Sequence, residues 1–405
     1  MGWSSSKLSA LLEKVIDNRG KTPPLVDDGI ELIETTSLTG GGKFPDYSLV
    51  RKYVSQQTFD TWFRAGHPRK GDILVATVGA NIGSAAMMRE ARGCVAQNLV
   101  GLRANAEKAD PDFLYYYLTW NRSREELTRL DIGAAQPSLK VPHLLNVEIL
   151  LPPLSVQRRI AGVLSAYDDL IENNQRRIKI LEEMARSLYR EWFVNLRFPG
   201  HEKLPLVDSP LGDIPQGWEV KHLQDVANVT YGFPFQSKKF NTTGVGTPVI
   251  RIRDILDAST DTFTDEDAEP KYHVKNGDIL VGMDGDFHMC IWSSGHAFQN
   301  QRVAKFESRG EIGNFHLFLA LELPIQTWNK SIVGTTVAHL GDMHIKTIRL
   351  AWPPGNFLAK VQEILEPMSE QIIALKRQIQ NLRRTRDLLL LRLVSGRLPL
   401  KNSDG

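Results

Sequence analysis

An internal repeat constrains this chain more than any other feature of its sequence. The pentapeptide Gly-Asp-Ile-Leu-Val occurs at 71–75 and again at 277–281. A longer segment, residues 133–153, aligns without a gap on residues 334–354, and both copies end in Pro-Pro. The segments follow the same order in both halves, so the repeat predicts two copies of one structural unit. A length of 405 residues also exceeds what one hydrophobic core normally supports.

A long stretch with apolar residues at alternating spacings of four and three follows each Pro-Pro pair. This spacing is typical of a heptad seam between paired helices. Because neither domain obviously needs so long an amphipathic helix, we expect each seam to pack against the other. The expected seam residues are Ile160, Leu164, Tyr167, Ile171, Asn174, Ile178, Leu181 and Leu188 in the first copy and Val361, Leu365, Met368, Ile372, Leu375, Ile379, Leu382 and Leu389 in the second.

Three residues depart from an ideal apolar seam. Asn174 and Arg386 would place polar groups between the helices, where such groups fix the register at a cost in stability. Pro367 removes one helical hydrogen bond, so we expect a break or kink in the first turns of the second helix.

The remaining sequence has short β-rich stretches and helical stretches, punctuated by Gly, Asn and Pro. It predicts a mixed α/β (α+β) fold with two similar domains in a pseudo-two-fold repeat, separated by two long antiparallel helices that form a coiled coil. The expected boundaries are domain 1 at 1–154, a long helix at 155–197, domain 2 at 198–354 with a linker at 198–218, and a second long helix at 355–397.

Composition places the chain among folded soluble proteins. It is 42% hydrophobic and 24% charged, and its longest apolar runs fall far short of the ~18–20 residues that span a bilayer. Cys94 and Cys290 lie far apart in sequence, which fits a reducing compartment, so we expect a cytoplasmic location. The sequence lacks a phosphate-binding loop and a dinucleotide-binding motif. We therefore assign no catalytic residue. His288, Cys290 and His296 are close in sequence, but one cysteine beside two histidines is more typical of packing than of metal binding, so we assign no metal site.

Net charge neither proves nor excludes a nucleic-acid partner. The formal charge is +2, whereas a DNA-binding domain is usually strongly basic. The acidity is local, because residues 254–269 contain seven acidic side chains and no basic one. This stretch could face solvent or repel DNA while the rest of its domain stays mildly basic.

The order of segments resembles the DNA-specificity subunit of Type I restriction–modification enzymes. The resemblance rests on the blocks 151–164, 211–223 and 232–237 and on both Gly-Asp-Ile-Leu segments, and it covers essentially the whole chain. It implies two target-recognition domains, each reading one half of a bipartite site in double-stranded DNA. It also implies that the helices dock methyltransferase subunits, with two copies expected, and that the catalytic centres lie on those partners.

The same resemblance sets the expected cofactor and partners. We expect no cofactor on this chain, with S-adenosylmethionine on the methyltransferase subunit, and a prokaryotic cytoplasmic location without a membrane partner. Restriction (nuclease and translocase) subunits are a further candidate partner. The alternative hypothesis is a coiled-coil scaffold with paired protein-binding domains and no sequence-specific DNA binding.

Candidate DNA contacts come from basic and amide side chains near the divergent loops. Because the two copies differ most after the Gly-Asp-Ile-Leu segment, they would read different half-sites within an asymmetric target. Arginine and lysine hold phosphates or guanine, and amides and histidine bond base edges. The candidates are Arg64, Arg69, Lys70, Asn81, Gln136, Lys238, Lys239, Arg251, Arg253, His288 and His339.

Overall fold

The computed structural model describes residues 3–40, 42–120, 138–310, 312–331 and 339–398. The chain divides into two compact units: unit 1 comprises residues 1–173 and 380–405, and unit 2 comprises residues 174–379. Each unit therefore contains one copy of the repeat and a part of both long helices. No helix within the described ranges is long and apolar enough to cross a membrane.

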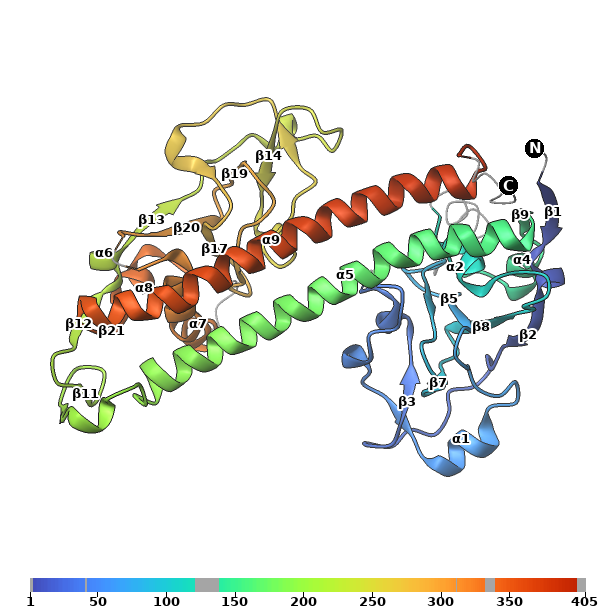
Figure 1. Cartoon of the computed structure of the whole chain (residues 1–405), viewed down its shortest axis with the longest axis horizontal. Helices are drawn as coiled ribbons and strands as arrows, with labels where there is room; N and C mark the ends of the chain where they lie inside the picture. The colour runs from blue at the N-terminus through green and yellow to red at the C-terminus, as the bar shows by residue number, and fades with distance from the viewer. Residues whose placement is uncertain (1–2, 41, 121–137, 311, 332–338, 399–405) are drawn as a thin grey trace, which may run out of the picture. The chain divides into compact units, whose positions relative to one another are not determined.

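Unit 1 is built on a four-stranded antiparallel sheet in the order β2 (Leu12–Ile16), β8 (Leu99–Ala104), β5 (Ile73–Ala76) and β6 (Ala85–Met87). A second sheet has the order β4 (Tyr53–Val54), β3 (Ile30–Ile33) and β7 (Cys94–Val95), in which β3 and β7 are parallel. Strand β1 (Ser4–Lys7) pairs with β9 (Glu148–Leu151). Within its described residues this domain has the α-helices α1 (Gln56–Trp62), α2 (Pro111–Thr119) and α4 (Val141–Leu145) (Figure 1).

Unit 2 repeats the order of the four-stranded antiparallel sheet and has one more strand in its second sheet. Its first sheet has the order β13 (Ala227–Tyr231), β20 (Val303–Ser308), β17 (Ile279–Gly282) and β18 (Met289–Ile291). Its second has the order β15 (Phe263–Thr264), β14 (Thr247–Ile250), β19 (Ala297–Gln299) and β16 (His273–Val274), with β14 and β19 parallel. Strand β12 (Glu219–His222) pairs with β21 (Arg349–Trp352), as β1 does with β9. The remaining elements are β10 (Leu206–Val207), β11 (Ile214–Pro215), α6 (Leu223–Val226), α7 (Asn314–Ser331) and α8 (Asp342–Thr347).

The matching strand orders confirm the predicted mixed α/β fold with an internal repeat. The Gly-Asp-Ile-Leu segments lead into β5 and β17, which occupy the same place in their sheets and are buried along their whole length. A strand that is buried on both faces reads as a continuous apolar run. This explains why the apolar residues of this segment recur in both copies.

The two long helices, α5 (Leu154–Tyr189) and α9 (Gly355–Val394), pack against each other in antiparallel directions. In unit 1, Asp168 of α5 contacts Arg386 of α9. In unit 2, Asn174 donates a hydrogen bond to Gln378, and Glu182 pairs with Lys376. Because the α9 partner falls in number as the α5 residue rises, the helices run in opposite directions, as Figure 1 shows. The prediction of a packed antiparallel pair is confirmed.

Every expected seam residue lies at least partly buried. The buried ones are Ile160, Leu164, Ile171, Asn174, Ile178, Val361, Leu365, Ile372, Leu375 and Ile379. The partly buried ones are Tyr167, Leu181, Leu188, Met368, Leu382 and Leu389.

The ends of the helices also belong to the core of unit 1. Ile160 and Leu164 of α5 and Leu393 of α9 share one hydrophobic cluster with Phe113 of α2. Gln157 of α5 adds a polar anchor, because its buried side chain accepts a hydrogen bond from the backbone N–H at the start of α2. The apolar stripe therefore serves two purposes, helix pairing along its length and attachment to the domain at its end.

The expected break at Pro367 is wrong, because α9 is one continuous helix through that residue. A proline inside a helix costs roughly 3 kcal/mol through the lost hydrogen bond and a steric clash. Leu365 and Ile372 flank it and are buried. Tertiary packing of an amphipathic face supplies most helical stability in proteins, so this packing offsets the local cost.

Candidate nucleic-acid interface

The Gly-Asp-Ile-Leu segment forms the same turn in both units. Gly71 and Gly277 have φ angles of +85° and +92°, a region that disfavours residues with a side chain. The carboxylates of Asp72 and Asp278 each accept a hydrogen bond from the backbone N–H three residues earlier, at 2.7 and 2.9 Å. This segment therefore supports the strand that follows it. Differences between the two units begin beyond the strand.

Three segments of unit 1 meet at the end of β5. The Thr77 N–H donates to the carbonyl oxygen of Asn98 at 2.9 Å, and the Leu139 N–H donates to the carbonyl oxygen of Thr77 at 2.8 Å. Val78 forms an isolated bridge with Ser138. We call this arrangement the three-segment junction of unit 1, and it displays the side chains of Val78, Asn98 and Ser138.

Unit 2 has the same junction at the end of β17. The Met283 N–H donates to the carbonyl oxygen of Arg302 at 3.0 Å, and the Leu340 N–H donates to the carbonyl oxygen of Met283 at 2.7 Å. Asp284 forms an isolated bridge with His339. The backbone hydrogen bonds correspond one for one with those of unit 1, but the displayed side chains are Asp284, Arg302 and His339.

The junction of unit 1 borders a cleft of about 570 Å³. Val78 and Asn98 line this cleft together with Gly79 and the exposed Gln97. Within the part of the chain that the structure describes, the Asn98 side-chain oxygen is buried and accepts no hydrogen bond. A buried acceptor without a donor costs free energy, so this oxygen is a ready acceptor for a ligand group.

The junction of unit 2 is a cluster of charged and titratable side chains. The Nδ1–H of His339 donates to Oδ1 of Asp284 at 2.6 Å, and Nε of Arg302 lies 3.3 Å from Oδ2 of the same carboxylate. The side chains of Arg302 and His339 are 55% and 46% exposed, whereas Asp284 is 27% exposed. One carboxylate thus holds two solvent-facing nitrogen-containing groups at the surface.

The candidate DNA contacts of unit 1 fall in three places. Arg64, Arg69 and Lys70 are exposed, the last two in the turn before β5. Asn81 is partly buried in the loop after β5 and lines a second cleft, described below. Gln136 lies outside the described residues.

Most cations proposed for unit 2 are already paired with the acidic stretch. Lys239 lies 3.8 Å from Glu266, and both Arg251 and Arg253 lie 3.6 Å from Asp261. Among the residues that the structure describes, Lys238, on an exposed turn, and His288, exposed at the end of its loop, form no ion pair with this stretch. The acidic residues therefore compensate neighbouring cations of their own domain, a role that local charge counting did not reveal.

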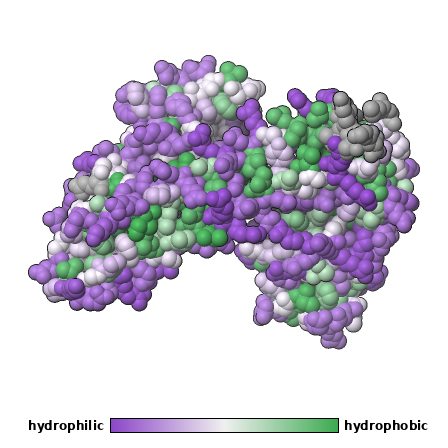
Figure 2. All heavy atoms as spheres, viewed as in Figure 1, coloured by the Kyte–Doolittle hydropathy of each residue, from purple (hydrophilic) through white to green (hydrophobic). Residues whose placement is uncertain are grey.

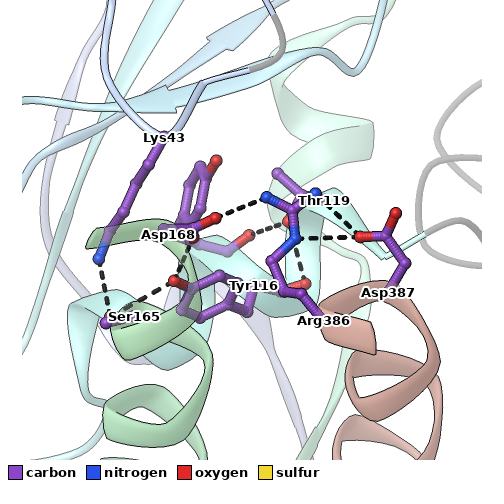
Figure 3. A network of polar contacts seen from close by, with 8 residues as sticks. Lys43, Tyr116, Thr119, Ser165, Asp168, Arg386 and Asp387 are labelled. Atoms are coloured by element: carbon purple, nitrogen blue, oxygen red, sulfur yellow. Dashed lines mark hydrogen bonds and ion pairs between the residues drawn. The ribbon is translucent and has the colours of Figure 1, made fainter. Parts of the chain in front are cut away.

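A polar network joins the domain of unit 1 to the two long helices (Figure 3). Arg386 of α9 contacts Asp168 of α5 at 2.5 Å, and the Tyr116 hydroxyl of α2 donates to the same carboxylate. Lys43 donates to the Ser165 hydroxyl at 2.9 Å. The side chain of Asp168 is only 8% exposed, so its charge depends on these donors.

The surroundings shift the pKa of two groups in this network. Burial, and then the charge of Asp168, raise the pKa of Tyr116, so the phenol stays a neutral donor. Burial lowers the pKa of Arg386, but the charge and hydrogen bond of Asp168 outweigh it and raise the pKa overall. The network borders a cleft of about 680 Å³ that also includes Asn81 and Trp120. The contacts of the network are those of a structural ion pair, in which Asp168 is held between the Arg386 guanidinium and the Tyr116 hydroxyl.

Sequence reasoning missed Asp284, Arg302 and Asn98. They come from separate segments that meet only in the folded sheet. The sequence held one signal. When the segment of β8 is aligned with that of β20, Gln97 matches Gln301, and Asn98 then corresponds to Arg302. That match is too short to have been significant without the strand pairing.

Comparison with known proteins gives a consistent result. Residues 32–183 and 215–383 match the Type I restriction modification DNA specificity domain. The chain is 28% identical to the Type I restriction enzyme MjaIX specificity subunit of Methanocaldococcus jannaschii over 304 residues, which is 71% of this chain and 69% of the relative. It is 34% identical to the EcoBI specificity subunit of Escherichia coli over 196 residues, which is 47% of this chain and 41% of that relative.

A solved structure shares the fold. The crystal structure of the Type I restriction–modification system S subunit from M. genitalium superposes with a TM-score of 0.58 at 19% identity, covering 99% of this chain and 97% of the other. The matched residues make up well over half of the sequence and include both repeats. The chain therefore belongs to the Type I restriction–modification DNA specificity family, as a non-catalytic specificity subunit with two target-recognition domains.

Proposed function

We propose that this subunit directs a Type I methyltransferase to an asymmetric bipartite site in double-stranded DNA, with one half-site read by each target-recognition domain. Domain 1 (1–154) and domain 2 (198–354) would read independently. The observation that carries this proposal is the pair of three-segment junctions. An identical backbone arrangement with different displayed side chains is what two readers of different sequences require.

The helix pair would dock the methyltransferase subunits, in two copies. Leu170, Ile180 and Met184 of α5 are each about half exposed, at 51, 50 and 51%. Figure 2 shows that hydrophobic residues interrupt the hydrophilic surface along the long helices. Exposed apolar side chains grouped on one element favour a protein partner. Restriction subunits are a further candidate partner.

The catalytic chemistry would reside on the partners in a prokaryotic cytoplasm. S-adenosylmethionine would bind to the methyltransferase subunit, and this chain would hold no cofactor. The antiparallel packing of α5 and α9 supports half-sites of inverted orientation. The two half-sites would be separated by about one helical turn of DNA, roughly 34 Å, so that one domain can bind each of them.

The test is to purify the chain with the methyltransferase subunit of its own system and to map the methylated bases on a random DNA library. A single asymmetric bipartite motif with a fixed gap is the expected result. Unmodified DNA together with no gel shift at low salt would overturn the proposal and favour the scaffold hypothesis. Low salt matters because phosphate contacts dominate DNA affinity and weaken as salt rises.

Helix length offers a second test of the same proposal. Removing one matched heptad from α5 and α9 shortens each helix by about 10.5 Å. The unread gap of the motif should change while both half-sites stay the same. A changed half-site with an unchanged gap would contradict the assignment of spacing to the helices.

A further inference from the structure

We propose that the three side chains at each three-segment junction select a base pair, and that Arg302 in domain 2 reads a guanine while Asn98 in domain 1 reads an adenine. The inference rests on the proposed function and deepens it. The corresponding residues are Asp284, Arg302 and His339 in domain 2, and Val78, Asn98 and Ser138 in domain 1.

The backbone is the same at both junctions, so the side chains carry the difference. Asp284 stands where domain 1 has Val78, Arg302 where it has Asn98, and His339 where it has Ser138. Corresponding backbone groups form hydrogen bonds of 2.7 to 3.0 Å in both units. A substitution at these places can therefore change what is displayed without changing the sheet beneath it.

The terminal nitrogens of Arg302 can donate hydrogen bonds to a guanine. Asp284 lies against its Nε, and among the described residues no group accepts a hydrogen bond from its two terminal nitrogens. A guanidinium fork bonds O6 and N7 of guanine in a bidentate manner. The Asp284 carboxylate balances the Arg302 charge, so this pair is poorly suited to hold a phosphate and better suited to read a base edge.

His339 complements that reading on the opposite base. Its Nδ1 lies 2.6 Å from Oδ1 of Asp284, and in the tautomer that carries its proton on Nδ1 the ring presents Nε2 as an acceptor. Cytosine presents its N4 amino group as a donor in the major groove. One G·C pair therefore offers a partner for both exposed side chains of this junction.

The junction of domain 1 has the opposite preference. Val78 and Asn98 are uncharged, and the Asn98 side-chain oxygen has no donor within the described part of the chain. An asparagine amide bonds N6 and N7 of adenine in a bidentate manner, and the N6 amino group would satisfy this oxygen. Asn98 lines the cleft of about 570 Å³, and because its oxygen is buried, reading adenine requires this side chain to turn toward the cleft.

The test uses the complex of this chain with its methyltransferase subunit and reads the methylated motif of variants in domain 2. Arg302→Gln should shift one position of the second half-site from G·C toward A·T, because glutamine pairs with adenine. Discrimination at that position should fall by roughly 5- to 150-fold. Arg302→Lys, which keeps the charge but loses the fork, should relax the same position without a new preference.

The matched control is Arg309→Gln, which removes an exposed arginine of the same unit that follows β20, at the end of that strand opposite to Arg302. It should leave the motif unchanged. The triple variant Asp284→Val, Arg302→Asn, His339→Ser transplants the domain 1 set and should bring an A·T preference to that position.

Three outcomes separate the possibilities. An unchanged motif for Arg302→Gln in an assembled complex overturns the inference alone. A second result also overturns the inference: Arg302→Gln methylates every sequence more weakly to the same extent, whereas Arg302→Lys methylates normally. That pattern indicates a phosphate contact. If the unmodified chain yields no motif at all, the proposed function itself fails.

Discussion

Replacing Arg386 with leucine should destabilise unit 1, although leucine fits the heptad seam better than arginine. The substitution leaves Asp168, with 8% of its side chain exposed, without its ion-pair partner. Removing one partner of a buried pair costs roughly 3–5 kcal/mol. Tyr116 still donates to the carboxylate, so we expect about 3 kcal/mol, the low end of that range.

Replacing the other member of the pair, Asp168, should destabilise the unit less. In Asp168→Leu, Arg386 keeps Asp387 at 2.9 Å and is itself 21% exposed, so it retains a partner and access to water. We expect a loss of about 1–2 kcal/mol. The double variant buries two apolar side chains in place of the pair and should lie within about 1 kcal/mol of the wild type. The three values together predict a coupling free energy of about 3 kcal/mol or more.

Urea unfolding followed by circular dichroism gives the free energies, and native-state hydrogen exchange of the α2 amides localises the effect to unit 1. Arg384→Leu, on the exposed face of the same helix, is the control and should change stability by no more than about 0.5 kcal/mol. If the double variant costs as much as both single variants together, the two side chains do not interact energetically and the reasoning is refuted.

Three further predictions concern His316 in unit 2 and two glycines in unit 1. Burial lowers the pKa of His316, which packs against Phe193, to about 4, so the unfolded chain binds the proton first as pH falls. The free energy of unfolding should therefore drop by about 2 kcal/mol from pH 7 to pH 5, and His316→Phe should remove that dependence in denaturation curves. Gly93→Ala should destabilise by about 1–3 kcal/mol, because φ is +71° and a Cβ would lie 2.7 Å from the Glu31 carbonyl oxygen. Gly162 lies on α5, where an added Cβ would meet open space. Gly162→Ala should therefore increase the free energy of unfolding by about 0.5–1 kcal/mol and raise the melting temperature.

The periodic features of the sequence predicted most of the fold. The repeated Gly-Asp-Ile-Leu segment marked equivalent buried strands because a turn glycine, a capping aspartate and an apolar run are all local requirements. The heptad spacing predicted the helix pair because the periodicity is sustained. Pro367 misled that reading, since a local penalty does not show how firmly Leu365 and Ile372 hold the helix on either side.

The candidate site was predicted less completely, for a physical reason. His339 was found from sequence, but Asp284 and Arg302, which hold and accompany it, come from other segments that meet only in the folded sheet. The sequence did not show that the fold places Asp261 beside Arg251 and Arg253, two cations predicted to contact DNA. Charge in a linear sequence does not reveal which opposite charges the chain places next to it.

An exchange of one domain tests the central claim of independent reading most directly. Residues 1–150 are replaced by the corresponding segment of a family member with a different methylation motif, and the motif of the hybrid is sequenced in complex with the methyltransferase. The account predicts that one half-site takes the donor's sequence while the other half-site and the gap stay as they were. A hybrid that assembles and methylates, but changes both halves or neither, would contradict it.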